Sequence, residues 1–154
     1  MSTEDIRSYH KVDERVITSG QPTEGQIRAA AEDGVQVLIN LATIDPRYSL
    51  DDEAGLAQSV GLEYHHIPVV WEQPTPADFD AFVAVMRQTQ DKRKLIHCAA
   101  NYRVTAFYSL YAMQDLGWSA EQAAALRAVM WHQKYPVWDT FIQNMQTHIQ
   151  AGKP

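Results

Sequence analysis

The sequence predicts an α/β protein of three layers (α/β/α), with a mainly parallel sheet of four to five strands and a helical C-terminal third. Two observations support this fold class. Short apolar runs alternate with segments of helical periodicity, the order that a parallel sheet with crossover helices requires. After residue 98, only helical segments follow. The 154 residues, of which 45% are hydrophobic, suffice for one core. We therefore expect a single domain over residues 1–154, with residues 1–9 as a flexible tail.

Four short apolar runs, each flanked by turn-forming residues, predict the strands. They lie at residues 15–20, 35–41, 63–70 and 94–98. The second run, VQVLINL, is apolar at nearly every position, which is typical of a strand buried on both faces. We expect these runs to form the sheet.

Capping signals and apolar periodicity predict the helices. Thr23 and Ser119 are each followed by a glutamine three residues later, the spacing of a capping box. Thr75 followed by Pro76 is typical of an N-cap and a first-turn proline. The helices are expected at residues 24–33, about 50–60, from 76 onward, 103–116, from 120 onward and about 136–150.

Charge and composition limit the possible partners. The net charge of −6 disfavours nucleic acid and anionic membranes, because no basic patch could dominate such a surface. No run of about eighteen apolar residues occurs, so we expect no membrane span. A single cysteine fits a reducing compartment, and the first residues lack the apolar stretch of a signal peptide. We expect a soluble, cytoplasmic protein, although an export signal removed earlier would leave no trace.

The stretch KLIHCAANYRV places the single cysteine, Cys98, at the end of the last predicted strand. In open α/β sheets, ligands bind beyond the carboxyl ends of the strands. The backbone amides that follow would form an anion-binding nest at a helix N-terminus, and this field favours the nucleophilic thiolate. The guanidinium of Arg103 can hold two oxygens of a phosphate. The alternative is a cysteine that serves only as a small core residue. The expected phosphate-binding residues are Ala99, Ala100, Asn101, Tyr102 and Arg103.

The segment IHCAANYRV resembles the phosphate-binding loop (P-loop) of the cysteine-dependent protein tyrosine phosphatases, whose signature is His-Cys, five residues and Arg. Here four residues separate Cys98 from Arg103, the loop has no glycine, and Val104 stands where Ser or Thr is usual. The shorter spacing is more similar to that of the bacterial β-lactamase hydrolase-like phosphatases, a group formerly without an assigned function. VITSGQPTEGQIRAAAEDGVQVLINL and GLEYHHIPV resemble that group too. The resemblance covers about residues 10–118.

This resemblance implies a protein tyrosine/dual-specificity phosphatase-like fold and a phosphatase that needs no cofactor and no metal. Cys98 would attack phosphorus, and Arg103 would hold the phosphoryl oxygens. His97 would shape the loop by hydrogen bonding without reacting. Thr105 could supply the hydroxyl that Val104 lacks if the backbone is shifted by one position. A general acid would lie on a loop well before the cysteine.

Glu72 is the first candidate for this acid, because it is the one carboxylate between the end of the third predicted strand and Thr75. It fits a solvated loop charge equally well. Asp78 fits a carboxylate at the start of a helix. Asp45, in the loop after VLINL, is the second candidate acid. Trp71 is a candidate wall of the acid loop, with core packing as the alternative.

We expect a phosphatase that hydrolyses a phosphate monoester through a cysteinyl-phosphate intermediate, with a phosphorylated small molecule or a phosphoprotein as substrate. A loop shortened by one residue has one amide fewer for the phosphoryl oxygens, so we expect weak activity or a narrow substrate range. Two alternatives stay open: a rhodanese-like sulfurtransferase, whose loops share the short spacing, and a non-catalytic anion-binding module. No metal site is expected, because His65 and His66 point to opposite faces of a strand.

Overall fold

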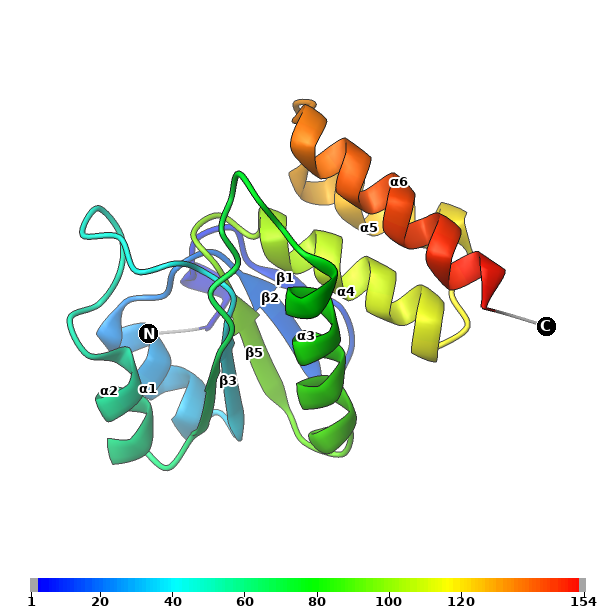
Figure 1. Cartoon of the computed structure of the whole chain (residues 1–154). Coiled ribbons are helices and arrows are strands. Elements are labelled where there is room, and N and C mark those ends of the chain that lie inside the picture. Colours follow the sequence, from blue (N-terminus) through cyan, green and yellow to red (C-terminus); the bar gives the residue numbers. More distant parts are fainter. Residues whose placement is uncertain (1–2, 153–154) are drawn as a thin grey trace.

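The central layer of the computed structural model, which describes residues 3–152, is a five-stranded sheet (Figure 1). The strands are β1 (His10–Lys11), β2 (Val16–Ser19), β3 (Val37–Asn40), β4 (Glu63–His66) and β5 (Lys94–His97). They lie in the order β1-β2-β5-β3-β4, and all neighbours are parallel except β1 and β2. The predicted mainly parallel sheet is confirmed. The antiparallel β1 is an addition, because two residues carry no periodicity that could predict a strand.

Three of the helices begin where their capping residues predict, whereas the helix expected from about residue 50 begins at Glu53, about three residues later than expected. The helices are α1 (Glu24–Glu32), α2 (Glu53–Ser59), α3 (Pro76–Gln88), α4 (Tyr102–Asp115), α5 (Ala120–Met130) and α6 (Pro136–Ala151). Thr23, Thr75 and Ser119 each accept a hydrogen bond from the amide three residues later, and a full capping box forms at all three helix starts. Of the helices within residues 3–152, none combines the length and the apolar character that a membrane span requires.

Helices cover both faces of the sheet, so the three inner strands, β2, β3 and β5, are buried on both sides. Successive side chains of a strand point to opposite faces. Leu38 and Leu95 lie in the apolar cluster on the side of α1 and α2, whereas Ile39 and Ile96 lie in the cluster on the side of α3 and α4 (Figure 1). All four side chains are fully buried. VLIN and KLIH therefore show no polar–apolar alternation, as is typical of parallel strands.

The strand β5 occupies the middle of the sheet. Its Leu95 pairs with Ile17 of β2 on one side and with Leu38 of β3 on the other. The three parallel strands end at the same edge, so the chain leaves β5 at the centre of that edge. The residue that follows β5 is Cys98.

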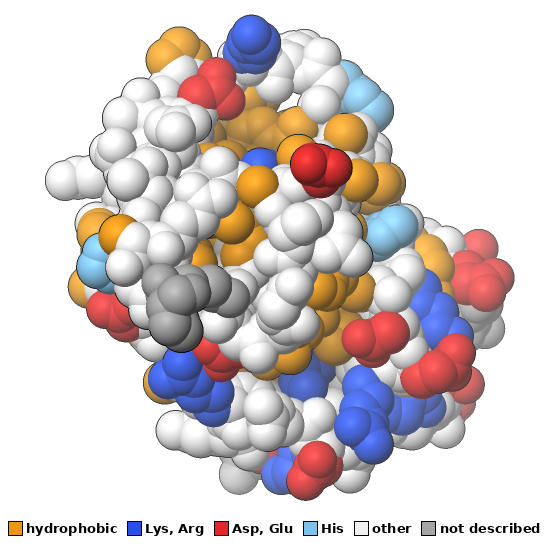
Figure 2. Space-filling view, turned by 90° about the vertical axis from the view of Figure 1, so that its right-hand side faces the viewer, with side chains coloured by type: hydrophobic (Ala, Val, Ile, Leu, Met, Phe, Trp, Pro, Cys, Tyr) orange, Lys and Arg blue, Asp and Glu red, His pale blue; other side chains and the backbone are white. Residues whose placement is uncertain are grey.

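The C-terminal third packs around α4 and forms part of the main core. All residues of α4 from Arg103 to Met113 are buried, and α5 and α6 lie on its outer side (Figure 1). Trp138 of α6 is fully buried, and its ring contacts Phe107 of α4. Figure 2 looks onto this side of the molecule, where a hollow lined by apolar side chains opens in the upper half and charged side chains gather below.

Residues 3–9 are packed against the domain, whereas the sequence suggested a flexible tail over residues 1–9. Thr3–Asp5 form a short 3-10 helix, η1. Ile6 is 2% exposed and joins the apolar cluster on the side of α1, and the amide of Gly20 donates to the carbonyl of Arg7. The buried isoleucine explains why this segment is held in place. Residues 1–2 lie outside the described residues.

Candidate active site

The loop that follows β5, residues 98–103, is held between the ends of β2 and β3. The amide of Cys98 donates to the carbonyl of Ser19 at 3.3 Å, and the amide of Gln21 donates to the carbonyl of Ala99 at 3.0 Å. A Cβ atom at Gly20 would lie 2.5 Å from the oxygen of Ala99. The glycine of the SGQP segment therefore allows the two backbones to approach. We refer to residues 98–103 as the P-loop.

Cys98 and Arg103 line one small pocket. The pocket has a volume of about 180 Å³ and is lined by Trp71, Cys98, Ala99, Ala100, Tyr102 and Arg103. Cys98 is 1% exposed. A water molecule in the liquid occupies about 30 Å³, so the pocket has room for a tetrahedral oxyanion. The lining holds one cation, Arg103, and no carboxylate.

The backbone amides of the P-loop are available for a ligand. Within the described residues, the amides of residues 99–103 donate to no backbone carbonyl. They precede and begin α4, whose 14 residues add partial positive charge at this end. This is the arrangement in which proteins bind phosphate and other anions.

Asn101 holds the backbone turn of the P-loop. It has a φ of 70°, in the left-handed region that asparagine tolerates better than most other residues. Asn101 thus stands in the conformation that a loop glycine would otherwise provide. Its side-chain amide donates to the carbonyl of Ser8 at 2.9 Å and to the hydroxyl of Thr18 at 3.0 Å. These bonds tie the P-loop to the N-terminal segment and to β2.

Arg103 is buried beside the pocket. Its Nη1 donates to the carbonyl of Val69 at 2.8 Å, and its guanidinium carbon lies 6.0 Å from the ring centroid of Trp71. Among the described residues, Val69 is the one hydrogen-bond partner of this guanidinium. The remaining N–H groups of the fork are left for an oxyanion.

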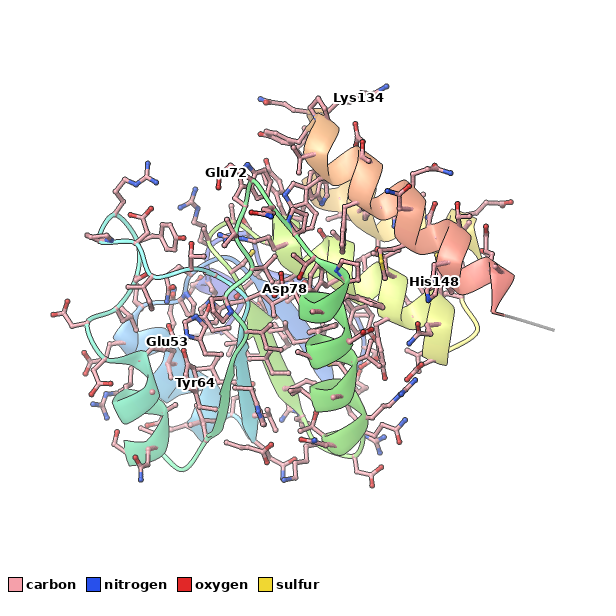
Figure 3. All side chains as sticks on the ribbon, viewed as in Figure 1. Glu53, Tyr64, Glu72, Asp78, Lys134 and His148 are labelled. Carbon is pink, nitrogen blue, oxygen red and sulfur yellow. The ribbon has the colours of Figure 1, made fainter. Side chains whose placement is uncertain are left out.

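The proposed acids lie outside the pocket lining. Glu72 is exposed, near the tip of the loop that joins β4 to α3 (Figure 3). Asp78 accepts from the amide of Thr75 in the capping box of α3. Asp45 is paired with Arg47 at 2.6 Å, and the side-chain hydrogen bond from Arg47 lowers the pKa of Asp45 to about 2. Of these residues, Glu72 is nearest in sequence to the pocket, one position after Trp71.

His97 lies beneath the P-loop and is fully buried. Its Nδ1 is 3.2 Å from the carbonyl oxygen of Cys98, and its Nε2 is 2.6 Å from Oε2 of Glu53. Sequence reasoning did not single out Glu53. A glutamate in the first turn of a helix is normally solvated, and only the packing of α2 against the sheet shows that it is 7% exposed.

Five aromatic rings connect the pocket to the C-terminal helices. Trp71, Tyr102, Trp131, Tyr135 and Trp138 contact one another at centroid distances of 5.0–6.1 Å. We call this set the aromatic cluster. Nε1 of Trp138 donates to the carbonyl of Trp71 at 2.8 Å. The sequence suggested Trp71 and Tyr102 for the pocket, but not the three residues from the C-terminal third.

Thr105 supports the P-loop from within α4. Its hydroxyl donates to the carbonyl of Asn101 at 2.9 Å and accepts from Nε1 of Trp131 at 3.1 Å. This hydroxyl therefore contacts the backbone of the loop and the aromatic cluster.

The adjacent histidines of β4 have separate partners. His65 Nε2 lies 2.6 Å from Glu63, and His66 Nε2 lies 2.6 Å from the carbonyl of Ala42. Over residues 3–152, no group of three or more His, Cys, Asp or Glu side chains is arranged to hold a metal ion.

A solved structure shares this fold and is similar in sequence over nearly the whole chain. It is a DUF442 candidate phosphatase from Shewanella putrefaciens CN-32, which is 31% identical, has a TM-score of 0.87 and is matched over 95% of each chain. The chain belongs to the DUF442 family. No family model matches the sequence of this DUF442 chain.

Curated relatives of the DUF442 chain are longer proteins. Two Beta-lactamase hydrolase-like proteins of Xylella fastidiosa, from strains Temecula1 / ATCC 700964 and 9a5c, are 30% and 28% identical over 132 and 138 residues. The matches cover 78% and 82% of this chain but 30% and 32% of those proteins. The chain thus spans about a third of the length of these relatives.

More distant structures confirm the phosphatase-like fold. The active form of Tk-PTP has a TM-score of 0.75 at 18% identity, covering 95% of this chain and 98% of its own. PTPMT1 has a TM-score of 0.74 at 21% identity, covering 93% and 96%. The expected protein tyrosine/dual-specificity phosphatase-like fold and the resemblance to the β-lactamase hydrolase-like group are both confirmed.

Proposed function

We propose that this DUF442 protein hydrolyses a phosphate monoester through a cysteinyl-phosphate intermediate. The observation that carries the proposal is the pocket that Cys98 and Arg103 share at the N-terminus of α4. Unpaired amides, a helix dipole and a guanidinium there favour both a bound phosphoryl group and a thiolate. The phosphatase-like fold and the DUF442 relative support the same reaction class.

The reaction has two steps. Cys98 Sγ attacks phosphorus, an S–P bond forms, and the ester P–O bond breaks while Glu72 donates a proton to the departing oxygen. Glu72, as carboxylate, then accepts a proton from a water that attacks phosphorus. The S–P bond breaks, and inorganic phosphate leaves with the thiolate restored. Arg103 and the P-loop amides hold the phosphoryl oxygens in both steps.

The lining also bears on the substrate. One cation in a pocket of about 180 Å³ suits a single phosphoryl group. The substrate is a phosphorylated small molecule or a phosphoprotein, and the short loop implies weak activity or a narrow range. We place the reaction in the cytoplasm, where a single cysteine is kept reduced.

The decisive test is Cys98→Ser, which replaces sulfur by oxygen in the one cysteine of the chain. Serine stays protonated at neutral pH, so hydrolysis of p-nitrophenyl phosphate should fall to background. The P-loop amides and Arg103 remain, so vanadate binding, measured by calorimetry, should be retained. Undiminished turnover by the serine variant would exclude the covalent mechanism.

One observation favours a second function, a rhodanese-like sulfurtransferase. The pocket lining contains no carboxylate. Transfer of sulfur from thiosulfate to Cys98 releases sulfite, which needs no protonated leaving oxygen, and cyanide can then take the sulfur as thiocyanate. Thiocyanate formation without phosphate ester hydrolysis would support this function. Vanadate binding without either activity would indicate a non-catalytic anion-binding module.

A further inference from the structure

A buried glutamate lies behind the nucleophile. Glu53, in the first turn of α2, is 7% exposed, and its Oε2 is 2.6 Å from Nε2 of the fully buried His97. The two residues belong to elements far apart in the sequence. Figure 3 shows Glu53 near Tyr64 of β4, away from the exposed Glu72. The pair is thus separate from the rim of the pocket.

The two hydrogen-bond partners of the His97 ring determine how many of its nitrogens must carry a proton. Nδ1 lies 3.2 Å from the carbonyl oxygen of Cys98, and Nε2 lies 2.6 Å from a carboxylate oxygen of Glu53. Both partners are acceptors, whereas a neutral imidazole has only one N–H group. Both contacts are hydrogen bonds when the ring is an imidazolium and Glu53 is ionised.

The surroundings of Glu53 stabilise its ionised form. Burial by itself raises the pKa of Glu53, but the hydrogen bond and charge of His97, with hydrogen bonds from Gln21 and Tyr64, bring the pKa below its ordinary value. Nε2 of Gln21 donates to the second carboxylate oxygen at 2.9 Å. Burial and the charge of Glu53 raise the pKa of Tyr64, so its hydroxyl keeps its proton at neutral pH.

The same surroundings contain no competing cation. The titratable group that faces the pair is Tyr64 from β4, and from the P-loop the backbone carbonyl of Cys98 contacts the ring. Asn40 of β3, which is neutral, donates to the hydroxyl of Tyr64 at 3.2 Å. Within residues 3–152, no lysine or arginine side chain is hydrogen-bonded to Glu53, whose partners include His97 and Gln21. The charge of the glutamate therefore acts on the ring beneath the nucleophile.

We propose that Glu53 is a positioning residue that keeps His97 doubly protonated, so that the imidazolium holds the Cys98 carbonyl and favours the thiolate. The inference rests on the proposed function only in that Cys98 acts as a thiolate, which phosphate hydrolysis and sulfur transfer share. An opposite charge within about 4–6 Å shifts a titration by about 1–3 pH units. The ring contacts the backbone carbonyl of Cys98 and not its sulfur, so we expect an effect at the lower end of this range.

Glu53→Gln tests the charge while keeping an oxygen that can accept from Nε2. In this variant, a neutral amide replaces the carboxylate, so no negative charge stabilises a second N–H group on the ring. The pH midpoint for alkylation of Cys98 by iodoacetamide, followed by mass spectrometry, should rise by about one unit or more. Alkylation at pH 7 should be about tenfold slower. Because Cys98 is the one cysteine of the chain, the signal has a single source.

A second His–Glu pair provides a matched control. Glu63 also lies 2.6 Å from a histidine, His65, but the pair is half-exposed on β4. Glu63→Gln should leave the alkylation profile unchanged. An unchanged profile for Glu53→Gln, or an equal shift for both variants, would overturn the proposal.

Two further measurements separate positioning from folding. The first is a double-mutant cycle with His97→Asn. Because Glu53 acts through the His97 ring, the double variant Glu53→Gln/His97→Asn should shift the pH midpoint for alkylation of Cys98 no further than His97→Asn alone. In the unaltered protein, ¹⁵N NMR of the histidine rings should show both nitrogens of His97 protonated at pH 7. A singly protonated ring would overturn the proposal even if Glu53→Gln does not fold. If the unaltered protein shows no phosphatase activity but Glu53→Gln still shifts the alkylation midpoint, the proposed function is refuted and the role of Glu53 is not.

Discussion

Glu72 follows directly on Trp71, a residue of the pocket lining, and its own side chain is exposed. That position makes it available to a substrate that enters from solvent. Glu72→Gln should slow hydrolysis of an alkyl phosphate by about 10²–10⁴, because an alkoxide leaves poorly without a proton. The effect on p-nitrophenyl phosphate should be far smaller, since its leaving group departs as an anion. Steady-state rates on the two substrates provide the comparison.

Asp45→Asn is the matched control for this prediction. The hydrogen bonds from Arg47 lower the pKa of Asp45 to about 2, so this carboxyl holds a proton less readily than an ordinary aspartate. The asparagine variant should therefore keep its rates on both substrates. Loss with Asp45→Asn and none with Glu72→Gln would transfer the acid role to Asp45. An equal loss on both substrates with Glu72→Gln would indicate that Glu72 only shapes the loop.

At the scale of residues, the sequence predicted the placement of those side chains whose position follows from the local succession of strand, loop and helix. The sequence predicted that Cys98 and Arg103 lie close together, as they do in the pocket, because a strand end, a short loop and a helix start are all encoded within a few residues. The contact of Glu53 with His97 could not be predicted from the sequence. This contact joins α2 to β5 across the sheet, and the sequence context of Glu53 is that of an ordinary first-turn carboxylate.

At the scale of elements, the P-loop depends on the left-handed backbone of Asn101. Asn101→Ala should lose the bonds to Ser8 and Thr18 and strain the turn, whereas Asn101→Gly should lose the same bonds without the strain. The alanine variant should therefore be less stable than the glycine variant by about 1 kcal/mol. Urea unfolding monitored by circular dichroism measures the difference. Equal stabilities would mean that the backbone at position 101 relaxes out of the left-handed region.

Helix starts and buried strands were predictable because their signals are local. Thr23 and Ser119 form the expected capping boxes, and Thr75 is the expected N-cap. The short β1 and the packed residues 3–9 were not predictable. The first forms by pairing with β2, and the second is held by burial of Ile6. Such elements depend on tertiary contacts, which the local sequence pattern of a short segment does not encode.

At the scale of the whole molecule, the C-terminal helices hold the loops of the candidate site. Trp138→Phe removes the hydrogen bond to the carbonyl of Trp71 and leaves a small void. We expect a loss of about 1–2 kcal/mol in the free energy of unfolding. Amide hydrogen exchange should become faster in residues 69–75. Val137→Ala, at a neighbouring position that is 48% exposed, should change neither quantity appreciably. Unaltered exchange in Trp138→Phe would show that the loop does not depend on α6.

The sequence alone predicted a helical C-terminal third but assigned it no part in the site. The aromatic cluster shows why. Trp131, Tyr135 and Trp138 contact Trp71 in the pocket lining only after α5 and α6 fold back over α4. Periodicity indicates which residues of a helix are apolar. It does not indicate which distant loop they will meet.

The place of β5 in the middle of the sheet also has a consequence for folding kinetics. Its partners, β2 and β3, come from much earlier in the chain, so both pairings require the closure of long loops. Cys98 becomes buried only when those closures are complete. During refolding, we therefore expect the thiol to react with a labelling reagent until the centre of the sheet has formed. The residue proposed to break phosphate esters is thus also a natural reporter of when the polypeptide reaches its native topology.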